Sequence, residues 1–169
     1  KLALVISKKY KLKKVGVPGD FPFAIARYLE SKGVRVECIG QFYPERYEKK
    51  ATEVEKITKT VRGIESALVG VKDILKKASI KGRYVVYRGD TLTSEYLKAE
   101  VEKILLKKGL ENTDGMIVSV GNQTSIPHHQ GEGKVLANMP IICDIYSRDK
   151  NTKYHGDLTR TYVKGEPSS

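Results

Sequence analysis

The sequence predicts an α+β fold, in which the helices and the main strands occupy separate parts of the chain. Three observations support this class. Between Val54 and Ile74 the apolar residues recur every three or four positions, as they do on one face of a long helix. Residues 93–108 predict a second helix. Residues 140–147 and 154–163 are rich in β-branched and apolar residues and flank a polar turn, which predicts a β-hairpin.

The first part of the chain alternates short strands with one helix. We expect strands at 2–6, 15–17 and 34–39. Residues 20–32 predict a helix, with Asp20 as its N-cap and Gly33 as its C-terminal stop. The lysine-rich segment 7–14 predicts an exposed hairpin edge, because lysine on an edge discourages pairing with another chain.

The helix at 93–108 has recognisable ends. Thr93 is expected to cap its first turn, and Glu95 interacts favourably there with the helix dipole. Gly109 follows two lysines and is expected to end the helix. A strand at 115–120 then precedes the hairpin.

Two aspartates are expected on one face of the hairpin. If the turn centres between Lys150 and Asn151, Asp144 lies directly opposite Asp157. Directly opposed like charges destabilise a sheet. A divalent cation that binds both carboxylates would compensate, and oxygen ligands of this kind suit Mn²⁺, Co²⁺ or Zn²⁺. The alternative is a pair of surface aspartates on a solvated hairpin.

These motifs resemble those of the pita-bread metallopeptidases, the family that contains methionine aminopeptidase, aminopeptidase P and prolidase. The resemblance is carried by Pro127-His128, by Asp144 on its strand, and by the run from Tyr154 to Thr161. Lys153 stands where the family usually has Gly, and the two aspartates are two residues further apart than is usual. Because both spacings are odd, the longer turn keeps the two carboxylates on the same face.

The resemblance implies a domain organisation. Residues 1–48 would be a remnant of a creatinase-like amino-terminal domain, and residues 49–169 the first αββ half of a pita-bread catalytic domain. The second half of that fold would supply one His and two Glu metal ligands that do not follow here. We therefore expect this chain, which begins with Lys rather than Met, to be a fragment and to be inactive by itself.

The resemblance also implies roles for individual residues. Asp144 would bind one metal ion and Asp157 would bridge two ions, while His128 would be the catalytic histidine that hydrogen-bonds the substrate near the scissile amide. His155 and Thr159 alternate onto the face of Asp157, where they could support a metal ligand. An exposed His and an ordinary strand Thr are the alternatives. We expect only a structural or surface role for the neighbouring histidine, His129.

Two classes of function follow. The first is a metal-dependent Xaa-Pro peptidase of the aminopeptidase P or prolidase type, whose substrate is a peptide with proline at the second position. The second is a non-catalytic homologue that binds protein or nucleic acid. The net charge of +11 is compatible with a nucleic-acid partner, but the lysines are spread along the chain, which argues against one. The aspartate pair favours the peptidase.

Composition limits location and partners. No apolar run is long enough to span a bilayer, and no signal-peptide pattern is present, so we expect no membrane partner. Cys38 and Cys143 are expected to be buried free thiols in a reducing cytoplasm. The uncovered face of half a sheet predicts a homo-oligomer or a complementing carboxy-terminal fragment.

Overall fold

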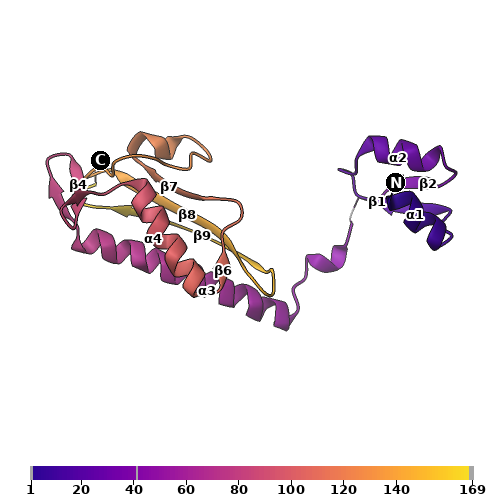
Figure 1. The fold of residues 1–169 in the computed structure, drawn as a ribbon, viewed down its shortest axis with the longest axis horizontal. Helices are drawn as coiled ribbons and strands as arrows, with labels where there is room; N and C mark the ends of the chain where they lie inside the picture. The colour runs from indigo at the N-terminus through magenta and orange to yellow at the C-terminus, as the bar shows by residue number, and fades with distance from the viewer. Residues whose placement is uncertain (1, 41, 168–169) are drawn as a thin grey trace. The chain divides into compact units, whose positions relative to one another are not determined.

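The computed structural model describes residues 2–40 and 42–167 (Figure 1). The chain separates into two compact units, Lys1–Lys49 and Lys50–Ser169. The boundary between them lies one residue after the expected one. That the first unit is the remnant of a creatinase-like domain stays a prediction.

The first unit is built around two short parallel strands. Its elements are the helices α1 (Leu2–Lys9) and α2 (Phe23–Glu30), the strands β1 (Lys14–Val17) and β2 (Arg35–Cys38), and the 3-10 helix η1 (Pro44–Arg46). Lys14 pairs with Arg35 and Val17 with Cys38, so β1, α2 and β2 form a βαβ unit.

Several predictions for the first unit were wrong. The expected strand at 2–6 is helical, because a short apolar run fits a buried strand and a helix equally well. Two of the lysines expected on a hairpin edge, Lys8 and Lys9, lie instead in the last turn of that helix, where they complement its dipole. Asp20 is not the N-cap of α2, which begins after Pro22. Cys38 is exposed rather than buried.

The second unit contains the predicted helices and strands of the α+β fold. Its elements are α3 (Ala51–Lys77), β3 (Ser79–Lys81), β4 (Tyr84–Tyr87), β5 (Asp90–Thr91), α4 (Ser94–Lys107), β6 (Leu110–Glu111), β7 (Met116–Val120), the 3-10 helix η2 (Gly121–Ser125), β8 (Pro140–Asp149) and β9 (His155–Val163). Thr93 caps α4 as predicted, with its hydroxyl accepting the N–H of Tyr96 at 3.2 Å. Gly109 follows α4 with φ +73°.

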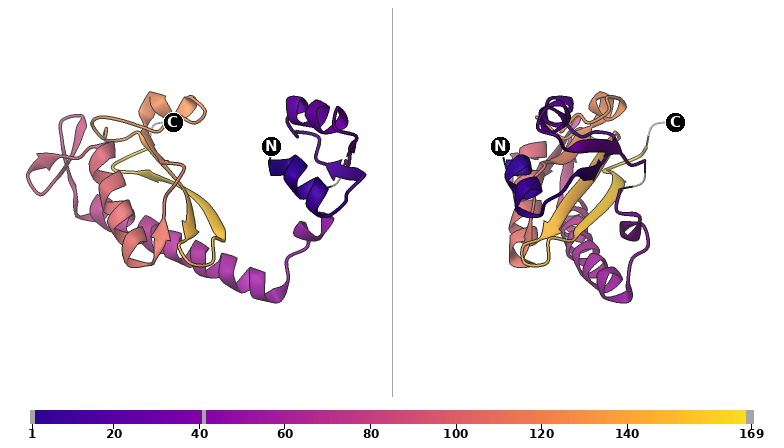
Figure 2. Two further views of the ribbon diagram at one scale, coloured as in Figure 1. Left: turned by 45° about the vertical axis from the view of Figure 1, so that its right-hand side comes forward. Right: turned by 90° about the vertical axis from the view of Figure 1, so that its right-hand side faces the viewer.

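The main sheet is antiparallel and has β8 at its centre. β9 pairs with one side of β8, and β7 and β6 pair with successive parts of the other side. The helix α3 packs against β8 and β9, while α4 packs against β6 and β7 (Figure 2). The short strands β3, β4 and β5 form a separate antiparallel sheet.

Alternation along β8 assigns its two faces. Ile141, Cys143 and Ile145 are fully buried in the core that the sheet shares with the helices. Burial raises the pKa of the Cys143 thiol to about 12, so this cysteine is an inert core residue. Asp144 and Tyr146 lie on the opposite face, where side chains are half-buried or exposed. The candidate site is on that opposite face.

Candidate metal-binding site

The two aspartates lie diagonally across the hairpin rather than directly opposite each other. Asp144 pairs with Thr159, and Asp157 pairs with Tyr146. The predicted direct opposition was therefore wrong, because the turn centres one residue later than assumed. The two carboxylates still share one face, since a shift of two residues in pairing preserves the alternation.

Asp149 explains the position of the turn. Its carboxylate, in a residue that is 3% exposed, accepts the N–H groups of Asn151 at 2.9 Å and Thr152 at 2.8 Å. These hydrogen bonds hold the pKa of Asp149 below its ordinary value, and the bond from Thr152 has the largest effect. Lys153 closes the turn with φ +60°, a conformation that favours glycine, which accounts for the glycine usual at this position. The backbone N–H of Asp149 then donates to the carbonyl oxygen of Tyr154 at 3.0 Å.

The carboxylate of Asp157 is affected by its surroundings and by Asp144. Burial, and then the charge and hydrogen bonding of Asp144, raise the pKa of Asp157 above its ordinary value. The Thr159 hydroxyl donates to Asp144 Oδ1 at 2.6 Å, which fixes one carboxylate. Repulsion of this kind is relieved by a proton or by a cation that both groups bind.

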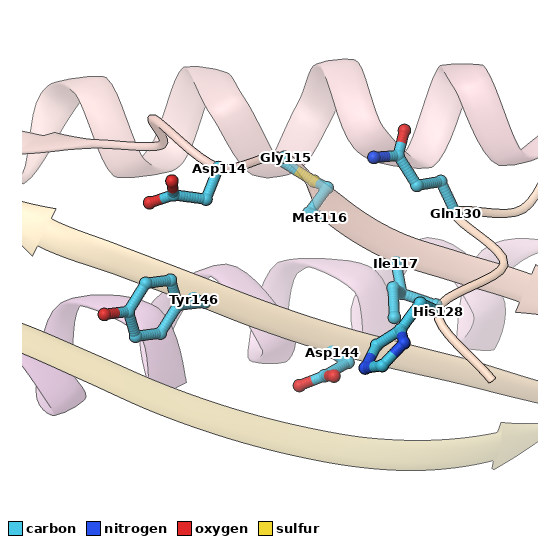
Figure 3. Close-up of a pocket in the computed structure, with 8 residues that line it drawn as sticks. All are labelled: Asp114, Gly115, Met116, Ile117, His128, Gln130, Asp144 and Tyr146. Carbon is cyan, nitrogen blue, oxygen red and sulfur yellow. The ribbon is translucent and has the colours of Figure 1, made fainter. Parts of the chain in front are cut away.

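A pocket of about 180 Å³ adjoins Asp144 (Figure 3). Its lining residues are Asp114, Gly115, Met116, Ile117, His128, Gln130, Asp144 and Tyr146. The structure thus brings His128 to the same pocket as Asp144. Sequence reasoning missed Tyr146, although period-two alternation from Asp144 would have placed it on this face. Asp114 precedes β7 and carried no recognisable signal.

The other two histidines have different surroundings. The ring of His155 stacks on Tyr146, with centroids 4.8 Å apart, and its Nδ1 is buried without a hydrogen-bond partner among the described residues. It therefore lies on the predicted face, against an aromatic ring beside the aspartates. His129 Nδ1 accepts the N–H of Gly131 at 2.9 Å, which is a structural contact within its own loop.

The two aspartates offer donor atoms that suit a divalent cation. Carboxylate oxygens suit such an ion. A bound cation would offset the burial and the charge of Asp144, which together raise the pKa of Asp157. Within residues 2–40 and 42–167, however, no three His, Cys, Asp or Glu side chains are grouped so that they could hold a metal ion. Asp144 and Asp157 therefore fit as part of a ligand set.

The fold, taken with the paired aspartates, is that of a partial pita-bread metallopeptidase. The model of Metallopeptidase family M24 matches residues 55–169, and the chain belongs to this family. Membership implies the use of a divalent metal. A search of curated proteins found no significant match.

Solved structures show the same fold at low identity. Prolidase from Pyrococcus furiosus is 18% identical with a TM-score of 0.73, and the match covers 93% of this chain and 43% of that one. X-Pro aminopeptidase from Thermotoga maritima is 21% identical with a TM-score of 0.71, over 99% and 45% of the two chains. Xaa-Pro dipeptidase from Bacillus anthracis is 19% identical with a TM-score of 0.71, over 99% and 44%. The chain therefore spans less than half the length of these proteins.

The described residues include no helix that combines the length and the hydrophobicity of a membrane span.

Proposed function

We propose that this chain supplies the first half of the active site of a metal-dependent Xaa-Pro peptidase of the aminopeptidase P or prolidase type. The observation that carries the proposal is the placement of Asp144 and Asp157 on one sheet face, where burial and the charge of Asp144 oppose ionisation of Asp157. Membership of metallopeptidase family M24 supports it, and so do neighbours described as prolidase, X-Pro aminopeptidase and Xaa-Pro dipeptidase.

The residues of this chain take distinct roles in the proposal. Asp144 and Asp157 hold part of a site for two Mn²⁺, Co²⁺ or Zn²⁺ ions, and Thr159 orients the carboxylate of Asp144 through its 2.6 Å hydrogen bond. When bound, the metal supplies Lewis-acid polarisation of a carbonyl oxygen and lowers the pKa of water. His128 hydrogen-bonds the peptide near its scissile amide, in the pocket beside Asp144. His155, stacked on Tyr146, supports the same face.

The proposed substrate is a peptide with proline at its second position, and its hydrolysis needs more ligands than this chain brings together. We therefore propose that the 169-residue chain is inactive by itself and works with a second copy or a complementing carboxy-terminal fragment. A cytoplasmic location is part of the proposal and is supported by the free thiols of Cys38 and Cys143.

Titration calorimetry with Mn²⁺ tests the site. We expect weak binding to the wild-type chain, and loss of it in Asp144→Ala. Asp73→Ala, which removes an exposed aspartate of α3, is the matched control and should bind as wild type does. Because protons compete with the metal for Asp157, whose pKa is raised, affinity should rise with pH until that carboxylate is fully ionised.

Identical isotherms for the wild type and Asp144→Ala at millimolar Mn²⁺ would contradict the assignment. That result would favour the alternative of a non-catalytic homologue that acts as a binding module.

A further inference from the structure

The loop that carries His128 is attached to the start of α4 by two charged side chains. The Lys98 ammonium donates to the carbonyl oxygen of Gly131 at 2.7 Å, and the N–H of Gly133 donates to Glu95 Oε1 at 2.9 Å. Both anchors come from the first two turns of α4, whereas the loop is more than 30 residues further along the chain. The backbone on the carboxyl side of His128 is thus clamped from a different element.

The same loop also lies against β7 at very short range. The carbonyl oxygen of Gln130 accepts the N–H of Val118 at 2.9 Å. Gly131 has φ +81°, and a Cβ atom there would lie 1.8 Å from the carbonyl oxygen of Val118. Any side chain at this position would overlap the backbone of β7, so only glycine lets the loop pass over the strand here.

Gln123 completes the attachment from η2. Its side-chain amide donates to the carbonyl oxygen of Glu132 at 2.9 Å, and its Oε1 accepts the N–H of Glu132 at 3.3 Å. Main-chain groups of every residue from His129 to Gly133 therefore have partners.

His128 itself depends on such support. Its side chain is exposed, and its backbone has φ +59°, a conformation that a non-glycine residue keeps only when its surroundings impose it. We propose that Glu95 and Lys98 are positioning residues for His128: they hold residues 131–133 so that the loop presents His128 to the pocket beside Asp144. This inference rests on the role of His128 in the proposed function.

The ionisation of Glu95 agrees with this assignment. The hydrogen bond from the Gly133 N–H is the largest cause of a lowered pKa for Glu95, so the carboxylate is charged while it holds the loop. Lys98 is half-buried, whereas Lys107 in the last turn of the same helix is exposed. The two lysines therefore form a matched pair for substitution.

The test compares Lys98→Met, Lys98→Arg and the control Lys107→Met by ¹⁵N relaxation of the complete chain. In the wild type, Lys98→Arg and Lys107→Met, the His128 amide should have an order parameter of about 0.85, typical of rigid backbone. In Lys98→Met and in Glu95→Ala it should fall below about 0.6, the range of flexible segments. Rescue by arginine separates a donor requirement from a general loss of packing.

An order parameter for His128 in Lys98→Met equal to that of the wild type, in a sample whose remaining amide spectrum is native, would overturn the positioning role. Paramagnetic broadening of the His128 ring protons by Mn²⁺ is the second readout. We expect it to fall several-fold in Lys98→Met, while Mn²⁺ affinity, which depends on the aspartates, stays the same. Absence of broadening in the wild type would contradict the proposed function, whereas the relaxation result still decides whether the anchors hold the loop.

Discussion

The carboxylate of Asp149 lies almost fully buried at the end of β8 and accepts two backbone N–H groups from the following turn. Lys59 Nζ is 3.7 Å away, but its side chain is mostly exposed and this contact adds little. These two hydrogen bonds from backbone N–H groups determine where the turn centres. They therefore determine which residues face Asp144 and Asp157 across the hairpin.

We predict that Asp149→Ala destabilises the second unit by about 1–2 kcal/mol, because two charge-assisted hydrogen bonds to the turn are lost. Since the pKa of Asp149 is lowered in the folded state, its contribution is present above the unfolded-state value and is lost as the pH falls through the folded-state value. Urea denaturation at neutral pH and at successively lower pH should show the difference between variant and wild type shrinking in acid.

Asp90→Ala, which removes an exposed aspartate at the edge of the small sheet, is the control and should change stability little. A pH-independent difference between Asp149→Ala and wild type would show that the carboxylate charge has no part in holding the turn.

At the scale of elements, the packing of β9 on α3 supports the hairpin. The Tyr162 hydroxyl donates to the carbonyl oxygen of Leu68 at 3.0 Å, and the Tyr154 hydroxyl donates to Glu53 at 2.8 Å. Between these contacts Gly156 brings the strand close to the helix. A Cβ atom at Gly156 would lie 3.1 Å from the backbone nitrogen of Val61.

We predict opposite outcomes for two glycine substitutions, one where β9 meets α3 and one where α4 meets α3. Gly156→Ala should destabilise the unit by about 1–3 kcal/mol, because the new methyl group meets helix backbone that cannot move aside. Gly70→Ala should be neutral or stabilise by up to about 1 kcal/mol, since the methyl group meets only the mobile Cδ1 end of Ile104 and helix propensity improves. Thermal unfolding of the two variants checks both. Equal destabilisation would mean that the helix backbone is no stiffer a neighbour than the Ile104 side chain.

At the scale of the whole molecule, we predict that a homogeneous 169-residue sample does not hydrolyse Xaa-Pro peptides when Mn²⁺ is added. Two carboxylates cannot position two ions, and no third ligand joins them within the described residues. Sedimentation at micromolar concentration should show a dimer or a retained fragment, because the sheet face with Asp144 and Tyr146 is half-buried or exposed and β9 pairs only with β8 among the described strands. Metal-dependent turnover by a clean monomer would contradict both expectations.

Local patterns in the sequence determined a large part of this protein. The apolar stripe from Val54 to Ile74 predicted the helix that became α3, and Thr93 marked the start of α4 through its own hydrogen bond. Alternation placed Asp144 and Asp157 on one face, and this held because the observed pairing differs from the assumed one by two residues, which leaves each side chain on its face. The motif containing Asp157 identified the family whose model matches the chain.

Tertiary structure decided what depends on partners distant in sequence or on the details of a turn. The hairpin register follows from the buried carboxylate of Asp149 and the left-handed Lys153, and residue types alone do not show which carboxylate will turn back to its own backbone. The attachment of the His128 loop joins residues more than 30 positions apart, beyond the reach of any local pattern. The apolar run at the start of α1 fits a strand or a helix equally well until its neighbours are known. Period and caps are local properties of a chain, whereas register and loop anchoring depend on contacts that exist only after folding.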